Sequence, residues 1–136
     1  MNFHWPKIVL PCGFKNVESY LRYLVEEGAR RKYGVLSSVV SERIDFELQS
    51  LKGYEPYFLI IHDIVEYCTD NNIFLYAVSN CASSSIVNYC LGITKVDPVK
   101  WKLPFEMFFL KTKMDCPVFE LNVGEGNRRG ILHHLR

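Results

Sequence analysis

The sequence predicts an α/β (α+β) domain in which N-terminal helices pack on a small sheet. Three observations carry this prediction. Apolar residues recur at helical spacing through the first half of the chain, the period changes near Asn72, and two short β-rich runs follow. With 136 residues, 49% of them hydrophobic and 23% charged, the chain has the size and composition of one globular domain.

Residues 1–15 are predicted to form an irregular arm, and residues 16–136 to form the folded domain. Residues that interrupt regular structure are frequent in the arm: Pro6, Pro11 and Gly13. Asn16 follows the arm and is a residue type that caps helices. The domain is therefore expected to open on a helix.

Three helices are expected in the first half of the domain. Asn16 caps a helix over residues 17–34, whose apolar residues share one face. Ser38 caps a second helix that ends at Gly53. The third helix spans residues 57–70 and is the most apolar of the three, so we expect it to be central.

The second half mixes strands and short helices. Residues 73–78 and 118–123 are β-rich and predict two strands. A short helix that Gly92 stops is expected between them, and a turn of helix is expected over residues 105–110. A final short helix, capped by Asn127, completes the predicted α/β pattern.

Charge and cysteine usage exclude several classes of protein. The net charge of +1 and pI of about 7.6 are far from those of a dedicated nucleic-acid binder. No apolar run approaches the ~20 residues of a membrane helix, and no secretory signal is visible, so we expect a cytoplasmic protein without membrane association. An odd number of cysteines without a C-x-x-C pair predicts buried free thiols rather than a metal site: Cys12, Cys68, Cys81, Cys90 and Cys116.

Several stretches resemble the opening of the palm in bacterial DNA polymerase III alpha subunits, the C-family polymerases. They are LRYLVEEGARRKYG (21–34), ERIDFEL (42–48), YFLI (57–60) with Asp63, LGIT (91–94), Asp97-Pro98, and Phe105-Glu106 with Phe108. The resemblance runs in order over residues 16–129 but covers only a small internal part of that long family. It implies a truncated relative of a DNA-directed DNA polymerase of DNA replication, with part of a polymerase-beta-like nucleotidyltransferase palm.

The resemblance assigns residues 76–85 to the family's phosphate loop, which reads roughly G-P-G-R-G-S-A-A-G-S. Glycines in such a loop let backbone N–H groups approach a triphosphate. This chain has YAVSNCASSS there, with Tyr76 and Val78 at glycine positions. We expect the cradle to be lost and the serines to act as helix caps. The vestigial loop positions are Ser79, Asn80, Cys81, Ser84 and Ser85.

The resemblance also assigns the metal site. The family carries P-D-x-D-x-D, in which alternate aspartates share one face of a strand and hold two Mg²⁺ ions. Counting from Pro117, the matching positions are Val118, Glu120 and Asn122. Because Val118 offers no ligand and Glu120 only one carboxylate, we expect no bound metal or other cofactor and no catalysis by this chain itself. The two β-rich runs should still be neighbours, since the two motifs converge on one substrate.

Three functions remain open at this point. The chain is an inactive relative of the polymerase, a nucleic-acid- or protein-binding module that reuses the palm scaffold, or a nucleotidyltransferase with rearranged ligands. Val118 argues against the last of these.

Two expectations concern partners. DNA binding should be weak or absent, because Arg128-Arg129 fits a solvated helix start and no aromatic interleaving marks a stacking platform among the lysines Lys95, Lys100, Lys102, Lys111 and Lys113. Self-association or a protein partner is expected through an apolar aromatic surface around Trp101, Phe105, Phe108 and Phe109.

Overall fold

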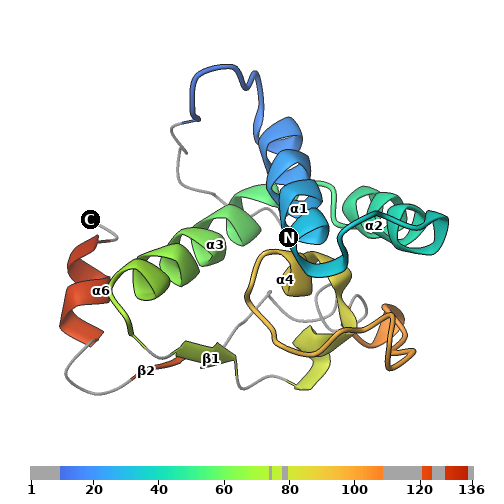
Figure 1. Cartoon of the computed structure of the whole chain (residues 1–136). Coiled ribbons are helices and arrows are strands. Elements are labelled where there is room, and N and C mark those ends of the chain that lie inside the picture. The colour runs from blue at the N-terminus through green and yellow to red at the C-terminus, as the bar shows by residue number, and fades with distance from the viewer. Residues whose placement is uncertain (1–9, 74, 78–79, 109–120, 124–127, 135–136) are drawn as a thin grey trace.

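The computed structural model describes residues 10–73, 75–77, 80–108, 121–123 and 128–134 (Figure 1). Within these residues the chain is mainly helical. The helices are α1 (Val17–Tyr33), α2 (Ser38–Ser50), α3 (Glu55–Asp70), the 3₁₀ helix η1 (Asn80–Ser84), α4 (Ile86–Cys90) and α6 (Arg128–His134). The strands are β1 (Leu75–Ala77) and β2 (Leu121–Val123).

The predicted α/β class is wrong. Helices dominate the described residues, and their strand structure is limited to two three-residue segments. A three-residue strand presents at most two side chains to one face, which is too little apolar surface for helices to pack on. The helices therefore pack on one another, and in place of the expected sheet β1 and β2 form only a two-stranded ribbon beside them (Figure 1).

The ribbon nevertheless confirms that the two β-rich runs are neighbours. β1 pairs with β2 in antiparallel register, with Leu75 opposite Val123 and Tyr76 opposite Asn122. The paired residues of the two strands lie 44 positions or more apart in the sequence. This is the pairing that the family resemblance implies.

The predicted bounds of α1 are confirmed. The Asn16 side chain accepts a hydrogen bond from the Ser19 N–H at 2.8 Å and caps the helix. At the other end Gly34 takes φ 74°, and its N–H bonds to the Arg30 carbonyl at 2.9 Å. A positive φ is a conformation that glycine adopts without steric cost, so the helix ends there.

The next two helices differ slightly from the prediction. The cap of α2 is Ser37 rather than Ser38, and its hydroxyl accepts the Val40 N–H at 3.3 Å. The helix ends at Ser50, three residues before Gly53. α3 starts two residues earlier than predicted, because Pro56 fits the first turn of a helix, where its missing N–H costs no hydrogen bond.

The hydrophobic core lies where α1, α2, α3 and α4 meet. Phe58 of α3 is fully buried in it, which agrees with the expected central place of that helix. Helices α1 and α4 approach so closely at Gly28 that a Cβ added there would lie 2.0 Å from the Cys90 carbonyl oxygen. Only glycine permits this crossing.

Helix α6 packs against α3 at the edge of the fold (Figure 1). Ile131 is its buried residue. The His134 ring stacks on Tyr67 at a centroid distance of 4.4 Å, and His134 Nε2 lies 2.8 Å from Asp63 Oδ2. Its predicted cap, Asn127, lies outside the described residues.

Cys68 and Cys90 are buried free thiols, as predicted. Cys12 is also a free thiol, but it is exposed, so the prediction of burial is wrong for this residue. Burial raises the pKa of the Cys90 thiol to about 12, so this thiol stays protonated and unreactive at neutral pH.

Candidate functional site

The loop that the resemblance assigns to phosphate binding leads into the N-terminus of α4. Ser85 caps this helix: its hydroxyl accepts the Asn88 N–H at 3.4 Å and donates to Glu47 Oε1 at 2.7 Å. Ser84 is also buried, with its hydroxyl 3.9 Å from the Met107 sulfur. The interpretation of Ser85 as a helix-capping residue is therefore confirmed.

The carboxylate that meets Ser85 comes from α2. Glu47 is 0% exposed and also accepts the N–H groups of Ile86 at 3.0 Å and Val87 at 3.3 Å. Arg43 Nε donates to the second carboxylate oxygen, Glu47 Oε2, at 2.6 Å. Burial raises the pKa of the Glu47 carboxyl above its ordinary value, because the loss of water opposes the charged form more than the surrounding donors favour it.

Arg43 extends this network beyond the carboxylate. Its Nη2 donates to the carbonyl of Ser84 at 2.7 Å and to that of Leu103 at 3.0 Å. One guanidinium thus fastens α2 to the end of η1 and to the segment after α4. Sequence reasoning missed both Arg43 and Glu47. The available signal was their spacing of four residues on a helix, which is more typical of an exposed pair.

These contacts occupy the N–H groups that an anion would bind at the N-terminus of α4. Its first N–H groups already donate to Glu47 and to Ser85. The Asn88 side chain also donates to the Ala82 carbonyl at 3.0 Å, which ties η1 back onto the helix. A phosphate would therefore have to bind to residues before α4, where the run 76–84 contains no glycine.

The structure places some of the predicted site residues. Asn80 and Cys81 lie in η1, whereas Ser79, Val118 and Glu120 lie outside the described residues. The β1–β2 register sets Asn122, a predicted metal position, directly opposite Tyr76, the first residue of the predicted phosphate loop. The backbone therefore brings the two predicted motifs side by side.

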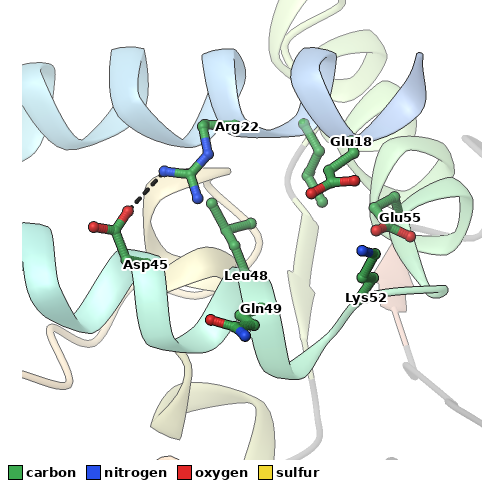
Figure 2. A pocket seen from close by; sticks show the side chains of 8 residues that line it. Glu18, Arg22, Asp45, Leu48, Gln49, Lys52 and Glu55 are labelled. Carbon is green, nitrogen blue, oxygen red and sulfur yellow. Dashed lines mark hydrogen bonds and ion pairs between the residues drawn. The ribbon is translucent and has the colours of Figure 1, made fainter.

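A separate cavity of about 260 Å³ lies between α1 and α2 (Figure 2). Its lining residues are Glu18, Leu21, Arg22, Asp45, Leu48, Gln49, Lys52 and Glu55. Arg22 Nη1 lies 2.7 Å from Asp45 Oδ1, and Glu55 accepts the Gly53 N–H at 2.7 Å. Charges of both signs line this cavity, so it favours no single class of ligand, and it contains none of the predicted site residues.

The expected aromatic surface is mostly buried. Phe105 is 3% exposed and Phe108 is 6% exposed, and both belong to the core, while Phe109 lies outside the described residues. Trp101 differs, since 64% of it is exposed. The prediction of an exposed patch is therefore wrong for two of its four aromatics and correct for Trp101.

The described part of the chain also lacks a metal-binding cluster and a membrane-spanning helix. No three or more His, Cys, Asp or Glu side chains gather there in a way that could hold a metal ion. None of the helices in that part is long and apolar enough to cross a membrane.

Comparison with known proteins decides the family. Residues 19–136 match the bacterial DNA polymerase III alpha NTPase domain. The chain belongs to this family. The DNA polymerase III subunit alpha of Borreliella burgdorferi is 34% identical over 96% of this chain, and that of Treponema pallidum is 31% identical over 96%. The error-prone DNA polymerase of Burkholderia mallei is 34% identical over 99%.

The chain covers only a small part of each of these three relatives. It spans 12% of the Borreliella burgdorferi protein, 11% of the Treponema pallidum protein and 13% of the Burkholderia mallei protein. The family match begins inside α1 and includes every later element, so it covers the Glu47 network and both strands.

Proposed function

We propose that residues 16–136 form a catalytically inactive relative of the DNA polymerase III alpha palm. By itself this domain binds neither Mg²⁺ nor a nucleoside triphosphate. One observation carries the proposal. The register that sets Tyr76 opposite Asn122 brings the two predicted motifs together, and at this junction neither residue is the one that the family pattern has.

The metal positions supply too little negative charge. Two Mg²⁺ ions carry four positive charges and bind through several anionic oxygens. Asn122 offers a neutral amide, Val118 offers no ligand atom, and Glu120 offers a single carboxylate. A two-metal site with this set of residues would be unstable.

The predicted phosphate-loop positions are unsuited to binding a triphosphate for a different reason. Tyr76 and Val78 occupy positions where the family pattern has glycine, and a side chain there keeps backbone N–H groups away from a ligand. The donors of α4 cannot substitute for them, because Glu47 and Ser85 occupy these donors. A triphosphate would therefore find neither bound Mg²⁺ ions nor free backbone N–H groups to hold its phosphates.

A spectroscopic titration tests the metal half of this proposal. Mn²⁺ replaces Mg²⁺ at carboxylate sites, and its free ion gives an electron paramagnetic resonance signal. The natural chain should leave that signal unchanged, whereas a variant with Val118→Asp, Glu120→Asp and Asn122→Asp should reduce it. Uptake of Mn²⁺ by the natural chain that equals uptake by the variant would contradict the proposal.

A second function, binding of a partner by the retained scaffold, is favoured by the exposure of Trp101. This function does not require catalysis.

A further inference from the structure

We propose that the chain self-associates through one exposed face of α2, which a second copy of the chain covers about a two-fold axis parallel to this helix. The surface, here called the α2 face, consists of Val39, Arg43 and Phe46 on α2 with Met107 at its edge. α2 is the teal helix at the right edge of the molecule in Figure 1. The proposal does not depend on the predicted metal or phosphate positions, so it stands whether or not the chain binds a nucleotide.

Apolar side chains on α2 remain in contact with solvent. Val39, Arg43 and Phe46 follow one another at spacings of four and three residues, which places them on one side of the helix. Val39 is 60% exposed and Phe46 is 54% exposed. The core therefore leaves this side of the helix uncovered.

Contacts within the chain extend the exposed surface beyond α2. The Phe46 ring lies edge-on against the buried ring of Phe105, with the two centroids 5.8 Å apart. Met107 is half exposed, and its sulfur lies 3.9 Å from the hydroxyl of Ser84, the residue whose carbonyl Arg43 binds. The apolar side chains thus lie around Arg43 on one surface. Apolar patches built from several segments mark interaction sites, whereas single exposed residues do not.

The two flanks of the α2 face carry complementary charges. Glu42 and Arg43 lie on opposite sides of the line from Val39 to Phe46, because successive helical residues are about 100° apart. Glu42 is exposed and forms no ion pair with a described residue. Arg43 donates through Nε and Nη2, which leaves Nη1 without a hydrogen bond to the described residues. One flank is therefore acidic and the other basic.

The segment beside Arg43 adds to the basic flank. Lys102 is exposed next to Leu103, whose carbonyl Arg43 binds at 3.0 Å. One acid, Glu106, is also exposed in this segment. Two cations against one anion leave this flank with a net positive charge.

A second copy of the chain provides the matching surface. When two α2 helices run parallel about a two-fold axis, the apolar residues meet across the axis, and the Glu42 flank of each copy meets the Arg43 flank of the other. A uniformly acidic or basic partner would instead place like charges against one flank. The net charge of +1 also produces little repulsion between two copies.

The dimer should be weak. A stable interface buries about 800 Å² on each partner, more than a few half-exposed side chains provide. We expect a Kd on the order of 100 µM, as for a transient contact. At the low micromolar concentrations of a denaturation experiment the chain is then monomeric, so the folding of each variant is checked there independently of association.

Sedimentation equilibrium from about 10 µM to about 1 mM tests the proposal. The average mass of the natural chain should rise toward that of a dimer. Glu42→Arg places a cation opposite Arg43 of the second copy and should weaken the dimer about tenfold. Phe46→Glu should weaken it by about tenfold or more, because the patch loses its aromatic centre.

The matched control lies on α6, far from α2 in Figure 1. Leu132 is also half exposed, and Leu132→Glu should leave the Kd within about twofold of the natural value. A natural chain that stays monomeric at about 1 mM would overturn the proposal. Glu42→Arg that associates as tightly as the natural chain would overturn it as well, and this substitution is at an exposed site, where it leaves the fold intact.

Disulfide trapping tests the orientation of the two copies. Val39→Cys, combined with Cys12→Ser to remove the exposed natural thiol, should give a covalent dimer on mild oxidation, because position 39 meets its own copy in a parallel contact. Leu132→Cys in the same background should not. Trapping that occurs only when Val39→Cys and Phe46→Cys chains are mixed would show antiparallel helices and would contradict the proposed pairing of charges.

Discussion

Ser85 donates its hydroxyl hydrogen to Glu47 across 2.7 Å, although the two residues are 38 positions apart in the sequence. This bond joins the start of α4 to a carboxylate on α2 that is completely buried. Arg43 donates a hydrogen bond to the second oxygen of the same carboxylate and two more to the backbone carbonyls of Ser84 and Leu103. The position of the segment that leads into α4, the predicted phosphate loop, is therefore set by α2.

Removal of the Glu47 charge should destabilise the fold. Glu47→Gln leaves the Arg43 guanidinium without its ionic partner and turns an amide donor toward backbone donors. We expect a loss of about 3 kcal/mol in the free energy of unfolding. Urea denaturation measures this loss, with the exposed Glu42→Gln on the same helix as the control. Equal effects of the two substitutions would show that the network contributes nothing.

The cost of the same substitution should depend on pH. Because burial raises the pKa of the Glu47 carboxyl, the folded chain holds this proton more tightly than the unfolded chain. The corresponding stability is present below the ordinary glutamate pKa of 4.5 and is lost as pH rises through the raised value. Glu47→Gln should therefore cost more near pH 4 than near pH 7. A larger cost at neutral pH would mean that the donors around the carboxylate outweigh its burial.

Gly28→Ala should disrupt the crossing of α1 and α4. The new Cβ would lie 2.0 Å from the Cys90 carbonyl oxygen, so the helices must separate. We expect a destabilisation of about 2 kcal/mol or more by overpacking. The exposed Arg31→Ala on the same helix is the control and should change stability by less than about 0.5 kcal/mol. At a site without the clash, glycine to alanine would stabilise a helix, so a gain in the melting temperature would refute the contact.

Tyr33→Phe should loosen the turn that carries Trp101. The substitution removes the hydroxyl that donates to Asp97 at 2.6 Å. Burial raises the pKa of the Tyr33 hydroxyl, so the hydroxyl remains a donor at neutral pH. We expect a loss of about 1 kcal/mol and faster hydrogen exchange at the Trp101 N–H, with Tyr23→Phe as the exposed control. Unchanged exchange would show that the turn is rigid without this bond.

Local signals predicted the helices well and the fold class poorly. Asn16 and Gly34 mark the ends of α1 because capping depends on a few adjacent residues. The two β-rich runs do pair, but the extent of a sheet depends on how many strands come together from distant parts of the chain. No pattern within residues 73–78 or 118–123 reveals that the described strands are only three residues long.

The same limit applies to the candidate site. Ser85 could be predicted as a cap because it directly precedes an apolar helical run. The burial of Glu47 could not, because it follows from the packing of α2 on α4. Trp101 and Phe105 lie four positions apart in the sequence, yet one is exposed and the other is buried in the core.

Calorimetry with Mg²⁺ and a deoxynucleoside triphosphate tests most directly the proposal that this chain binds neither of them by itself. The natural chain should give no saturable heat, with any binding weaker than about millimolar, equivalent to less than about 4 kcal/mol. The result should be the same with and without Mg²⁺. Saturable, Mg²⁺-dependent binding in the micromolar range would contradict the account.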